Sequence, residues 1–113
     1  MNDNLYIDVE EGLARVRGNK SLYIKMLNML LNSKEFDAFE ISLANNDYEE
    51  AGNVAHGIKG MTGNLSLSLL FKYSTELMNQ LRNGAPNEDT VAVYRETFIN
   101  TKKAVQEYIE QNS

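Results

Sequence analysis

The sequence predicts an all-α fold, an antiparallel bundle of long helices with a short helix at its N-terminus. Apolar residues recur at the spacing of amphipathic helices along most of the 113 residues. No segment has the alternating, β-branched pattern of a strand. Proline occurs once, at Pro86, inside the strongest cluster of helix-breaking residues. The chain suffices for one core but not two, so residues 1–113 are expected to form one domain.

Two helices are expected before residue 46. The first covers about residues 8–17 and ends at Gly18, which suits the left-handed position after a helix. Asn19 can cap the second, which runs to about residue 45. Residues 33–35 interrupt its apolar run, so it could be one helix or two, and we favour one because neither glycine nor proline enforces a break. The apolar stripe expected to face the core comprises Leu27, Leu30, Leu31, Phe36, Ala38, Phe39, Ile41 and Leu43.

Two further helices are expected in the C-terminal half. One begins near Ser66 and ends at residues 83–84, with a stripe formed by Leu70, Tyr73, Leu77 and Leu81. The last begins after Asn87, a favourable N-cap followed by acidic residues that suit the positive end of the helix dipole. Its stripe comprises Val91, Tyr94, Phe98, Val105, Tyr108 and Ile109. Short polar turns between long amphipathic helices favour an antiparallel bundle.

The composition excludes several classes of function. There is no cysteine and only one histidine, so thiolate chemistry is excluded and a metal site is not expected. A net charge of −5 disfavours nucleic-acid binding. No apolar run approaches the roughly 18 residues of a membrane span, and the acidic start MNDNLYIDVEE is unlike a signal peptide. We therefore expect a cytoplasmic protein, or a cytoplasmic domain of a longer one, without membrane insertion.

The remaining helix, from about Asp47 to Asn64, contains four of the seven glycines around the only histidine, His56. Asp47 and Glu50 form a capping-box-like pair at its start. On a helical wheel, the apolar residues fall on the side opposite His56, and they are Ala51, Val54, Ile58, Met61, Thr62 and Leu65. Gly52, Gly60 and Gly63 lie within about 40° of His56, with Asn53 and Lys59 about 60° to either side.

Glycine inside a helix costs about 0.8–1.0 kcal/mol relative to alanine, so four glycines need a compensating role. Close helix packing is one explanation. The interpretation that we favour is that the glycines clear the surface around His56 for the approach of another macromolecule. An exposed, neutral imidazole can then serve as a nucleophile that carries a group. Lys59, one turn later, can contact a transferred phosphoryl group.

The segment AHGIKGMTGNL, residues 55–65, resembles the phosphorylation site of histidine-containing phosphotransfer (HPt) domains, whose pattern is A-H-x-L-K-G. His56 matches the phosphorylated histidine, Lys59 the lysine and Gly60 the following glycine. Residues 7–27, IDVEEGLARVRGNKSLYIKML, are similar to the N-terminal pattern of the family, with its short helix and Gly-Asn turn. The resemblance extends over nearly the whole chain.

The resemblance implies an antiparallel four-helix bundle with a short accessory N-terminal helix. It also implies a phosphocarrier of a two-component phosphorelay and not an enzyme. His56 would be the phosphoacceptor and Lys59 would support the phosphate, with no cofactor in this chain and Mg²⁺ on the partner. The implied partners are response-regulator receiver domains and a hybrid sensor histidine kinase, and a monomer suffices for transfer. The residues expected at the docking surface are Gly52, Asn53, Gly57, Gly60, Gly63 and Asn64.

Two positions depart from the family pattern, and three other interpretations of the chain are weighed against it. Ile58 replaces the usual leucine, and Ser66 stands where glycine is common, which we interpret as an N-cap of the following helix. A helical adaptor without phosphoryl chemistry would use the glycine-rich face for binding alone. A redesigned bundle could keep the motif as a relic. With His56 as a general base, an enzyme would need a concave pocket, which bundles of this size seldom contain.

Overall fold

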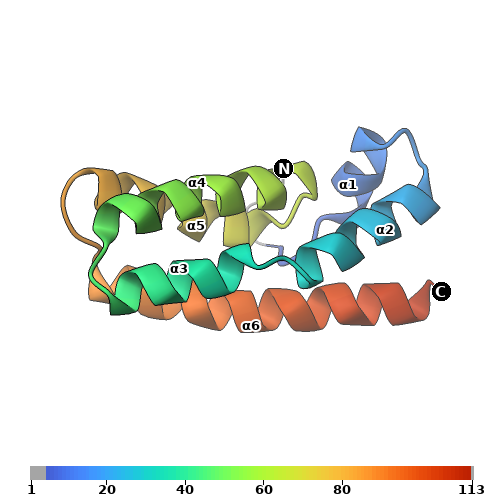
Figure 1. The fold of residues 1–113 in the computed structure, drawn as a ribbon. Coiled ribbons are helices and arrows are strands. Elements are labelled where there is room, and N and C mark those ends of the chain that lie inside the picture. The colour runs from blue at the N-terminus through green and yellow to red at the C-terminus, as the bar shows by residue number, and fades with distance from the viewer. Residues whose placement is uncertain (1–4, 113) are drawn as a thin grey trace.

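Six helices make up the fold in the computed structural model, which describes residues 5–112 (Figure 1). No strand occurs among these residues, so the all-α class is confirmed. Met1–Asn4, the start of the acidic N-terminal segment considered above, lie outside the described part. The helices are α1 (Val9–Arg15), α2 (Lys20–Leu31), α3 (Glu35–Ala44), α4 (Tyr48–Asn64), α5 (Ser68–Arg82) and α6 (Glu88–Gln111).

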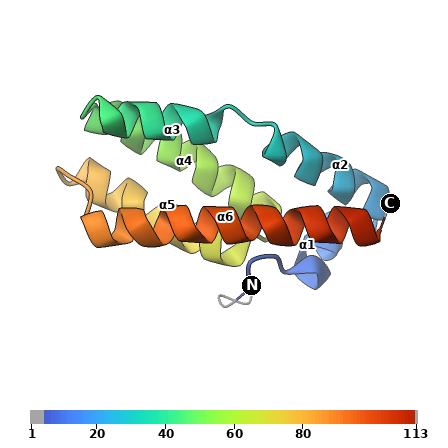
Figure 2. The same ribbon diagram turned by 90° about the horizontal axis from the view of Figure 1, so that it is seen from below.

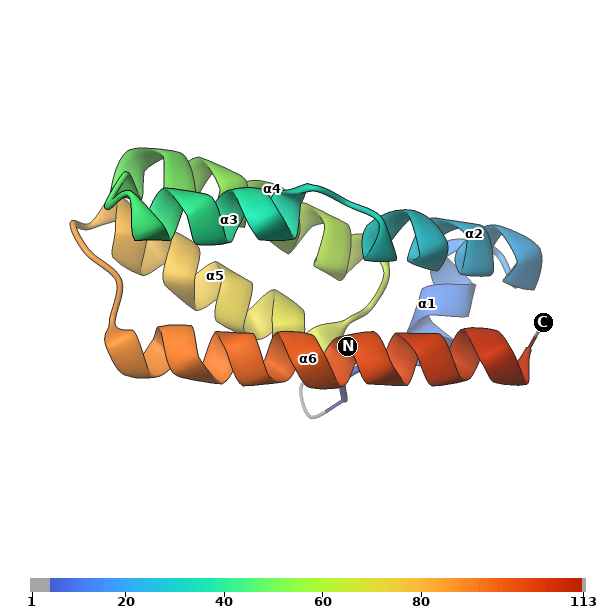
Figure 3. The same ribbon diagram turned by 60° about the horizontal axis from the view of Figure 1, so that its bottom comes forward.

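The longest helix, α6, runs along the full length of the molecule, which measures 40 × 24 × 21 Å (Figure 2). On the side above it, α2 and α3 follow one another along nearly one line (Figure 3). Helix α4 packs against both α3 and α5, and α5 packs against α6. The short α1 lies beside α2, at the end of the molecule away from the turn between α3 and α4 (Figure 1).

Residues 32–34 separate α2 from α3, so the prediction of one helix over residues 20–45 was wrong. Ser33 Oγ accepts a hydrogen bond from the backbone N–H of Glu35 at 3.2 Å. The side-chain amide of Asn32 donates to a carbonyl oxygen of the preceding turn at 3.0 Å. Short polar side chains that bond to nearby backbone groups compete with the helical ladder. Here they end one helix and begin another without glycine or proline.

The break also changes which face of α3 is buried. Phe36 and Phe39 are buried as predicted, but Ile41 is 62% exposed, so its assignment to the core was wrong. The helical wheel assumed an unbroken step of about 100° per residue, and the non-helical residues reset that phase. Leu27 and Leu30 of α2 are buried, and three further members of the predicted stripe are partly buried against the core: Leu31, Ala38 and Leu43.

Three helices end in a left-handed residue that is not glycine. In each, the residue after the left-handed one donates its backbone N–H to a carbonyl five residues earlier, the bond that defines a Schellman motif. The left-handed residues are Arg17 (φ 55°), Asn46 (φ 55°) and Ser66 (φ 58°). Gly18 also has a positive φ of 78°, but it lies one residue beyond the position predicted for it.

Ser66 belongs to the end of α4, so the prediction that it caps the following helix was wrong. It takes the left-handed position, and its buried hydroxyl donates to Glu11 Oε1 at 2.9 Å. Helix α5 instead begins after Leu67, without a side-chain cap. The other predicted N-caps are confirmed by hydrogen bonds from their side-chain oxygens to backbone N–H groups of the first turn, and they are Asn19, Asp47 and Asn87.

Helix α1 packs against the rest of the fold around Tyr23. The ring of Tyr23 is fully buried, and its hydroxyl donates to the carbonyl oxygen of Leu65 at 2.7 Å. Gly12 of α1 lies directly on this ring, so close that a Cβ atom at Gly12 would overlap it. The backbone N–H of Asp8 donates to the carbonyl oxygen of Ser66 at 2.8 Å. Helix α1 therefore rests on α2 and on the turn between α4 and α5.

The core lies between the helices and is rich in aromatic contacts between α3 and α6. The rings of Phe36 and Phe98 stack with centroids 4.5 Å apart, and those of Phe39 and Tyr94 lie 5.1 Å apart. The stripes predicted for α5 and α6 face this core, with Leu70, Leu77, Leu81, Val91, Tyr94 and Val105 buried and Tyr73, Phe98, Tyr108 and Ile109 partly buried. Within residues 5–112, the helices lack the apolar length needed to cross a bilayer.

We predict that Gly12→Ala destabilises the protein by about 2 kcal/mol, although alanine favours helix by about 1 kcal/mol. The added methyl group would meet the ring of Tyr23, which is buried and held through its hydroxyl. Urea unfolding of both proteins, followed by circular dichroism, measures the difference in free energy of unfolding. Equal or greater stability of the variant would contradict this account of how α1 docks.

Candidate functional site

The residues of helix α4 divide into a buried face and an exposed face, as the sequence predicts. Asp47 caps it by accepting from the backbone N–H of Glu50 at 3.2 Å, and the helix runs without a break to Asn64. Its apolar side is buried against α3 and α5, with Ala51, Val54, Ile58, Thr62 and Leu65 buried and Met61 half-buried. The buried hydroxyl of Thr62 donates back to the carbonyl oxygen of Ile58 at 2.8 Å. One face of α4 is thus committed to the core.

His56 lies on the opposite, exposed face of α4. Within the described residues, its imidazole has no hydrogen-bond or ion-pair partner. Lys59, one turn later, is half-buried and has no carboxylate partner in the same range. Because residues three apart on a helix share a face, both side chains are available to one ligand at this surface.

A depression of about 350 Å³ surrounds His56. Helices α1, α4 and α5 all contribute to it, and its lining is formed by Arg15, His56, Lys59, Gly60, Gly63, Asn64 and Phe71. Two of these side chains, Arg15 and Lys59, are cations, and the lining contributed by residues 5–112 contains no carboxylate. The arrangement suits an anion held beside an exposed imidazole.

The glycines differ in what surrounds them, and the expectation that they all clear the surface needs correction. A Cβ atom at Gly60 would meet nothing within 4 Å, so this position is open. At Gly52 it would lie 3.5 Å from Leu81 Cβ of α5, because that side of α4 packs against the neighbouring helix. The two other predicted docking glycines also have near neighbours, Gly57 the Glu35 carboxylate at 3.2 Å and Gly63 the Phe71 ring at 3.1 Å.

The two predicted asparagines lie at different places along α4. Asn64 lines the depression around His56. Asn53 is exposed but contributes to a separate depression nearer the start of α4, together with Gly52, Tyr48 and Arg82. The structure therefore brings together His56, Lys59, Gly60, Gly63 and Asn64, and leaves Gly52, Gly57 and Asn53 outside this depression.

Arg15 is the site residue that the sequence reasoning missed. It comes from α1, and its Nε donates to Glu11 Oε1 at 3.3 Å. Nothing in the sequence pattern alone says that α1 docks against the end of α4, since that contact depends on the Gly12–Tyr23 fit. The one usable signal was that Arg15 lies within the segment that resembles the N-terminal pattern of HPt domains.

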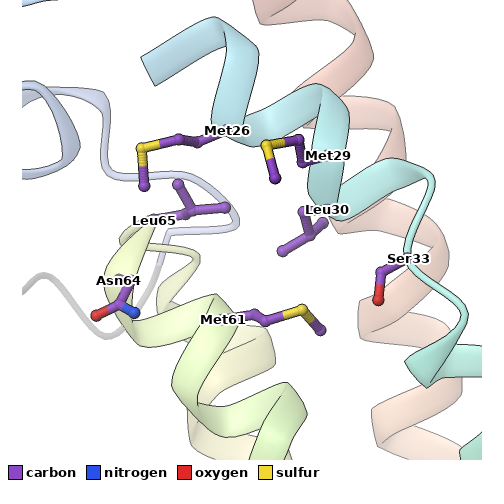
Figure 4. Close-up of a pocket in the computed structure, with 7 residues that line it drawn as sticks. All are labelled: Met26, Met29, Leu30, Ser33, Met61, Asn64 and Leu65. Atoms are coloured by element: carbon purple, nitrogen blue, oxygen red, sulfur yellow. The ribbon is translucent and has the colours of Figure 1, made fainter. Parts of the chain in front are cut away.

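An apolar groove adjoins the depression on the side of α2, with a volume of about 350 Å³ (Figure 4). Asn64 borders both hollows. Figure 4 shows three methionine side chains around the gap between α2 and α4, and Met29 among them is 64% exposed. The groove is lined by Met26, Met29, Leu30, Ser33, Met61, Asn64 and Leu65. It extends the exposed surface beside His56 with flexible apolar side chains.

The described residues contain no cluster of three or more histidine, cysteine, aspartate or glutamate side chains able to hold a metal ion. Comparison with known proteins found no matching family model, curated protein or solved structure. Membership of the HPt family therefore stays a prediction from the sequence motifs, and the chemistry of the site has to be argued from its own geometry.

We predict that Gly60→Ala stabilises the protein by about 0.5–1 kcal/mol, because the methyl group enters open space and alanine favours helix. Gly63→Ala is the matched comparison and should gain less, since its Cβ would lie 3.1 Å from the Phe71 ring. Urea unfolding of both variants measures the two free energies. A loss of stability in Gly60→Ala would mean that this position is not open.

Proposed function

We propose that this chain is a histidine phosphocarrier, with His56 accepting a phosphoryl group from an aspartate of one protein and passing it to another. The observation that carries the proposal is the exposed imidazole of His56, which has no partner among residues 5–112 and shares a depression with the cations of Arg15 and Lys59. A nucleophile that carries a group needs this exposure and a nearby cation, and it needs no adjacent base or metal ligand.

In the proposed reaction, the lone pair of one imidazole nitrogen of His56 attacks the phosphorus of an aspartyl phosphate. A nitrogen–phosphorus bond forms as the phosphorus–oxygen bond to the carboxylate breaks, and the carboxylate leaves with the bonding pair. The proton of the other ring nitrogen passes to the solvent. Lys59 contacts the phosphoryl oxygens and offsets their charge. The reverse sequence returns the group to an aspartate of the second partner.

The proposed partners are response-regulator receiver domains, one of them part of a hybrid sensor histidine kinase. They would supply the acidic pocket and Mg²⁺ that support in-line transfer, while this chain supplies the nucleophile and a docking surface without a cofactor. One copy of the chain is enough for this chemistry, so we propose a monomer acting in the cytoplasm, where such relays operate. The net charge of −5 gives no support for a nucleic-acid partner.

The arrangement of the helices supports this proposal. Helices α3, α4, α5 and α6 lie along the long axis, α2 continues the line of α3, and α1 is accessory, which fits an antiparallel four-helix bundle of the HPt kind (Figures 1 and 3). In this arrangement the middle of α4 is reachable from outside the molecule, and Gly60 leaves open space beside His56.

The first test is transfer from a panel of phosphorylated receiver domains to the wild-type protein and to His56→Gln. We expect acid-labile, base-stable phosphorylation of the wild type by at least one receiver, and none of His56→Gln, which keeps the size and polarity of the side chain. Lys59→Gln should slow transfer by about tenfold, because a charge-assisted contact to the phosphoryl group is lost. Intact mass and lability at acid and basic pH give the readout.

If no receiver transfers a phosphoryl group, direct phosphorylation by phosphoramidate distinguishes an unreactive site from a partner that is missing from the panel. A folded protein whose His56 reacts with phosphoramidate, but with none of the receivers, has a competent site and a partner outside the panel. A folded protein that reacts with neither is not a phosphocarrier, and the adaptor interpretation would then account for the exposed surface. Full activity of His56→Gln with a receiver would also overturn the proposal.

A second prediction concerns the docking surface. Met29→Gln should lower transfer from a receiver by about fivefold and leave phosphoramidate labelling unchanged, because Met29 is exposed in the apolar groove beside the site. Methionine suits a carrier that must fit two partners, since its side chain adapts to different surfaces. Ile41→Gln is the matched control, because Ile41 is equally exposed on α3 but lies outside the groove. Equal effects of the two substitutions would contradict a docking role for the groove.

A further inference from the structure

We propose that Arg15 is a second phosphate-binding residue of the His56 site, and that Glu11 and Ser66 position it. This inference rests on the proposed function and adds the binding chemistry of the same site. It gives α1 a role in binding the phosphoryl group, through a cation that α4 does not supply.

Arg15 reaches the depression from outside α4. It lines the same hollow as His56 and Lys59, and its side chain is 47% exposed. A phosphoryl group on His56 would therefore have a cation on α4 and another on α1. Two cations from different helices can contact different oxygens of one phosphoryl group, whereas residues of α4 alone approach it from a single side.

The contact with Glu11 leaves the binding edge of Arg15 available. Glu11 Oε1 accepts from Nε, at one edge of the planar guanidinium, at 3.3 Å. The two Nη groups have no hydrogen-bond partner among residues 5–112. Because the guanidinium is a rigid fork, fixing the Nε edge also fixes where the Nη donors point. Arginine then offers paired N–H groups to phosphate oxygens, which a lysine ammonium cannot do.

Glu11 is itself held by the end of α4. The buried hydroxyl of Ser66 donates to Glu11 Oε1 at 2.9 Å, so this oxygen accepts from both Ser66 and Arg15. Ser66 stands in a left-handed conformation, with φ 58°, which glycine would adopt at lower cost. The bond that the hydroxyl makes accounts for a serine at this position. The contacts from Ser66 through Glu11 to Arg15 link the guanidinium to the end of α4.

Phosphorylation of His56 by phosphoramidate tests this inference without a receiver. One imidazole nitrogen forms a bond to phosphorus as the phosphorus–nitrogen bond of phosphoramidate breaks; ammonia leaves, and the proton of the other ring nitrogen is released to it. We expect Arg15→Gln to lower the labelling rate by about fivefold and to weaken its dependence on ionic strength. Arg15→Lys should recover part of the rate, because it restores the charge without the fork.

The matched control is Arg17→Gln, which removes the same charge from the same end of α1. Arg17 is exposed and does not line the depression, so its replacement should leave the rate unchanged. Equal losses in Arg15→Gln and Arg17→Gln, or no loss in either, would overturn the inference. Thermal unfolding of each variant verifies that a changed rate does not reflect a changed fold.

Ser66→Gly tests the positioning step. It removes the hydroxyl that holds Glu11, and it also relieves the left-handed backbone, so the fold should lose little stability. We expect the labelling rate to fall about threefold with Arg15 still present. In the combined variant Ser66→Gly, Arg15→Gln, the rate should match that of Arg15→Gln alone, because Ser66 acts only through Arg15. If the combined variant instead lost rate by the product of the two single effects, the positioning role of Ser66 would be overturned.

Different results would contradict the role of Arg15 and the proposed phosphocarrier function. Labelling of His56 that is unchanged in Arg15→Gln overturns the role of Arg15 and leaves the phosphocarrier intact. If wild-type His56 reacts with neither phosphoramidate nor any receiver, the phosphocarrier is overturned, and titration with inorganic phosphate then decides the role of Arg15. The backbone amide signals of Gly60 and Asn64 should shift in the wild type and in Arg17→Gln but not in Arg15→Gln. Shifts of equal size in all three proteins would overturn the role of Arg15.

Discussion

The hydrogen bond from the buried hydroxyl of Tyr23 to the carbonyl oxygen of Leu65, at 2.7 Å, joins α2 to the end of α4. Gly12 lies on the same ring, so α1 docks where Tyr23 and the α4–α5 turn meet. A buried carbonyl without this donor would cost about 1–3 kcal/mol. The position of α1, and with it the basic side chain that α1 contributes to the His56 depression, depends on this contact together with the hydrogen bonds that Ser66 makes with Asp8 and Glu11. The accessory helix therefore contributes to the candidate site as well as covering the core.

Helix α4 meets two demands at once. Its apolar side closes the core between α3 and α5, while its outer side keeps His56 exposed and without a partner among the described residues. The glycines of this helix differ in their surroundings: a Cβ atom at Gly52 would make ordinary van der Waals contact with Leu81 of α5, whereas Gly60 leaves open space beside the imidazole. Each glycine costs the helix about 1 kcal/mol relative to alanine. At Gly60, we attribute this cost to the proposed approach of a partner.

The fold class, the order of the helices and the exposed face of α4 could be predicted from sequence, because hydrophobic periodicity and capping residues act locally. The polar residues 33–35 interrupt the apolar run and leave two helices possible, but the break itself could not be predicted, since it involves the bond between Ser33 Oγ and the Glu35 N–H and no glycine or proline. Nor could the role of Ser66, whose left-handed turn and contact with Glu11 join residues 55 positions apart. His56 and Lys59 were found through their spacing on one helix. Arg15 was missed because it reaches the depression through tertiary packing.

The central claim is that His56 carries a phosphoryl group, and a long-range ¹H–³¹P correlation spectrum of the intact protein tests it most directly. The spectrum would be recorded after incubation with the phosphorylated receiver panel. The account predicts one phosphorus signal coupled to the ring protons of the only histidine in the chain. A folded protein that shows no phosphorus signal after incubation with the panel and then with phosphoramidate, or shows one coupled to another residue, would contradict it.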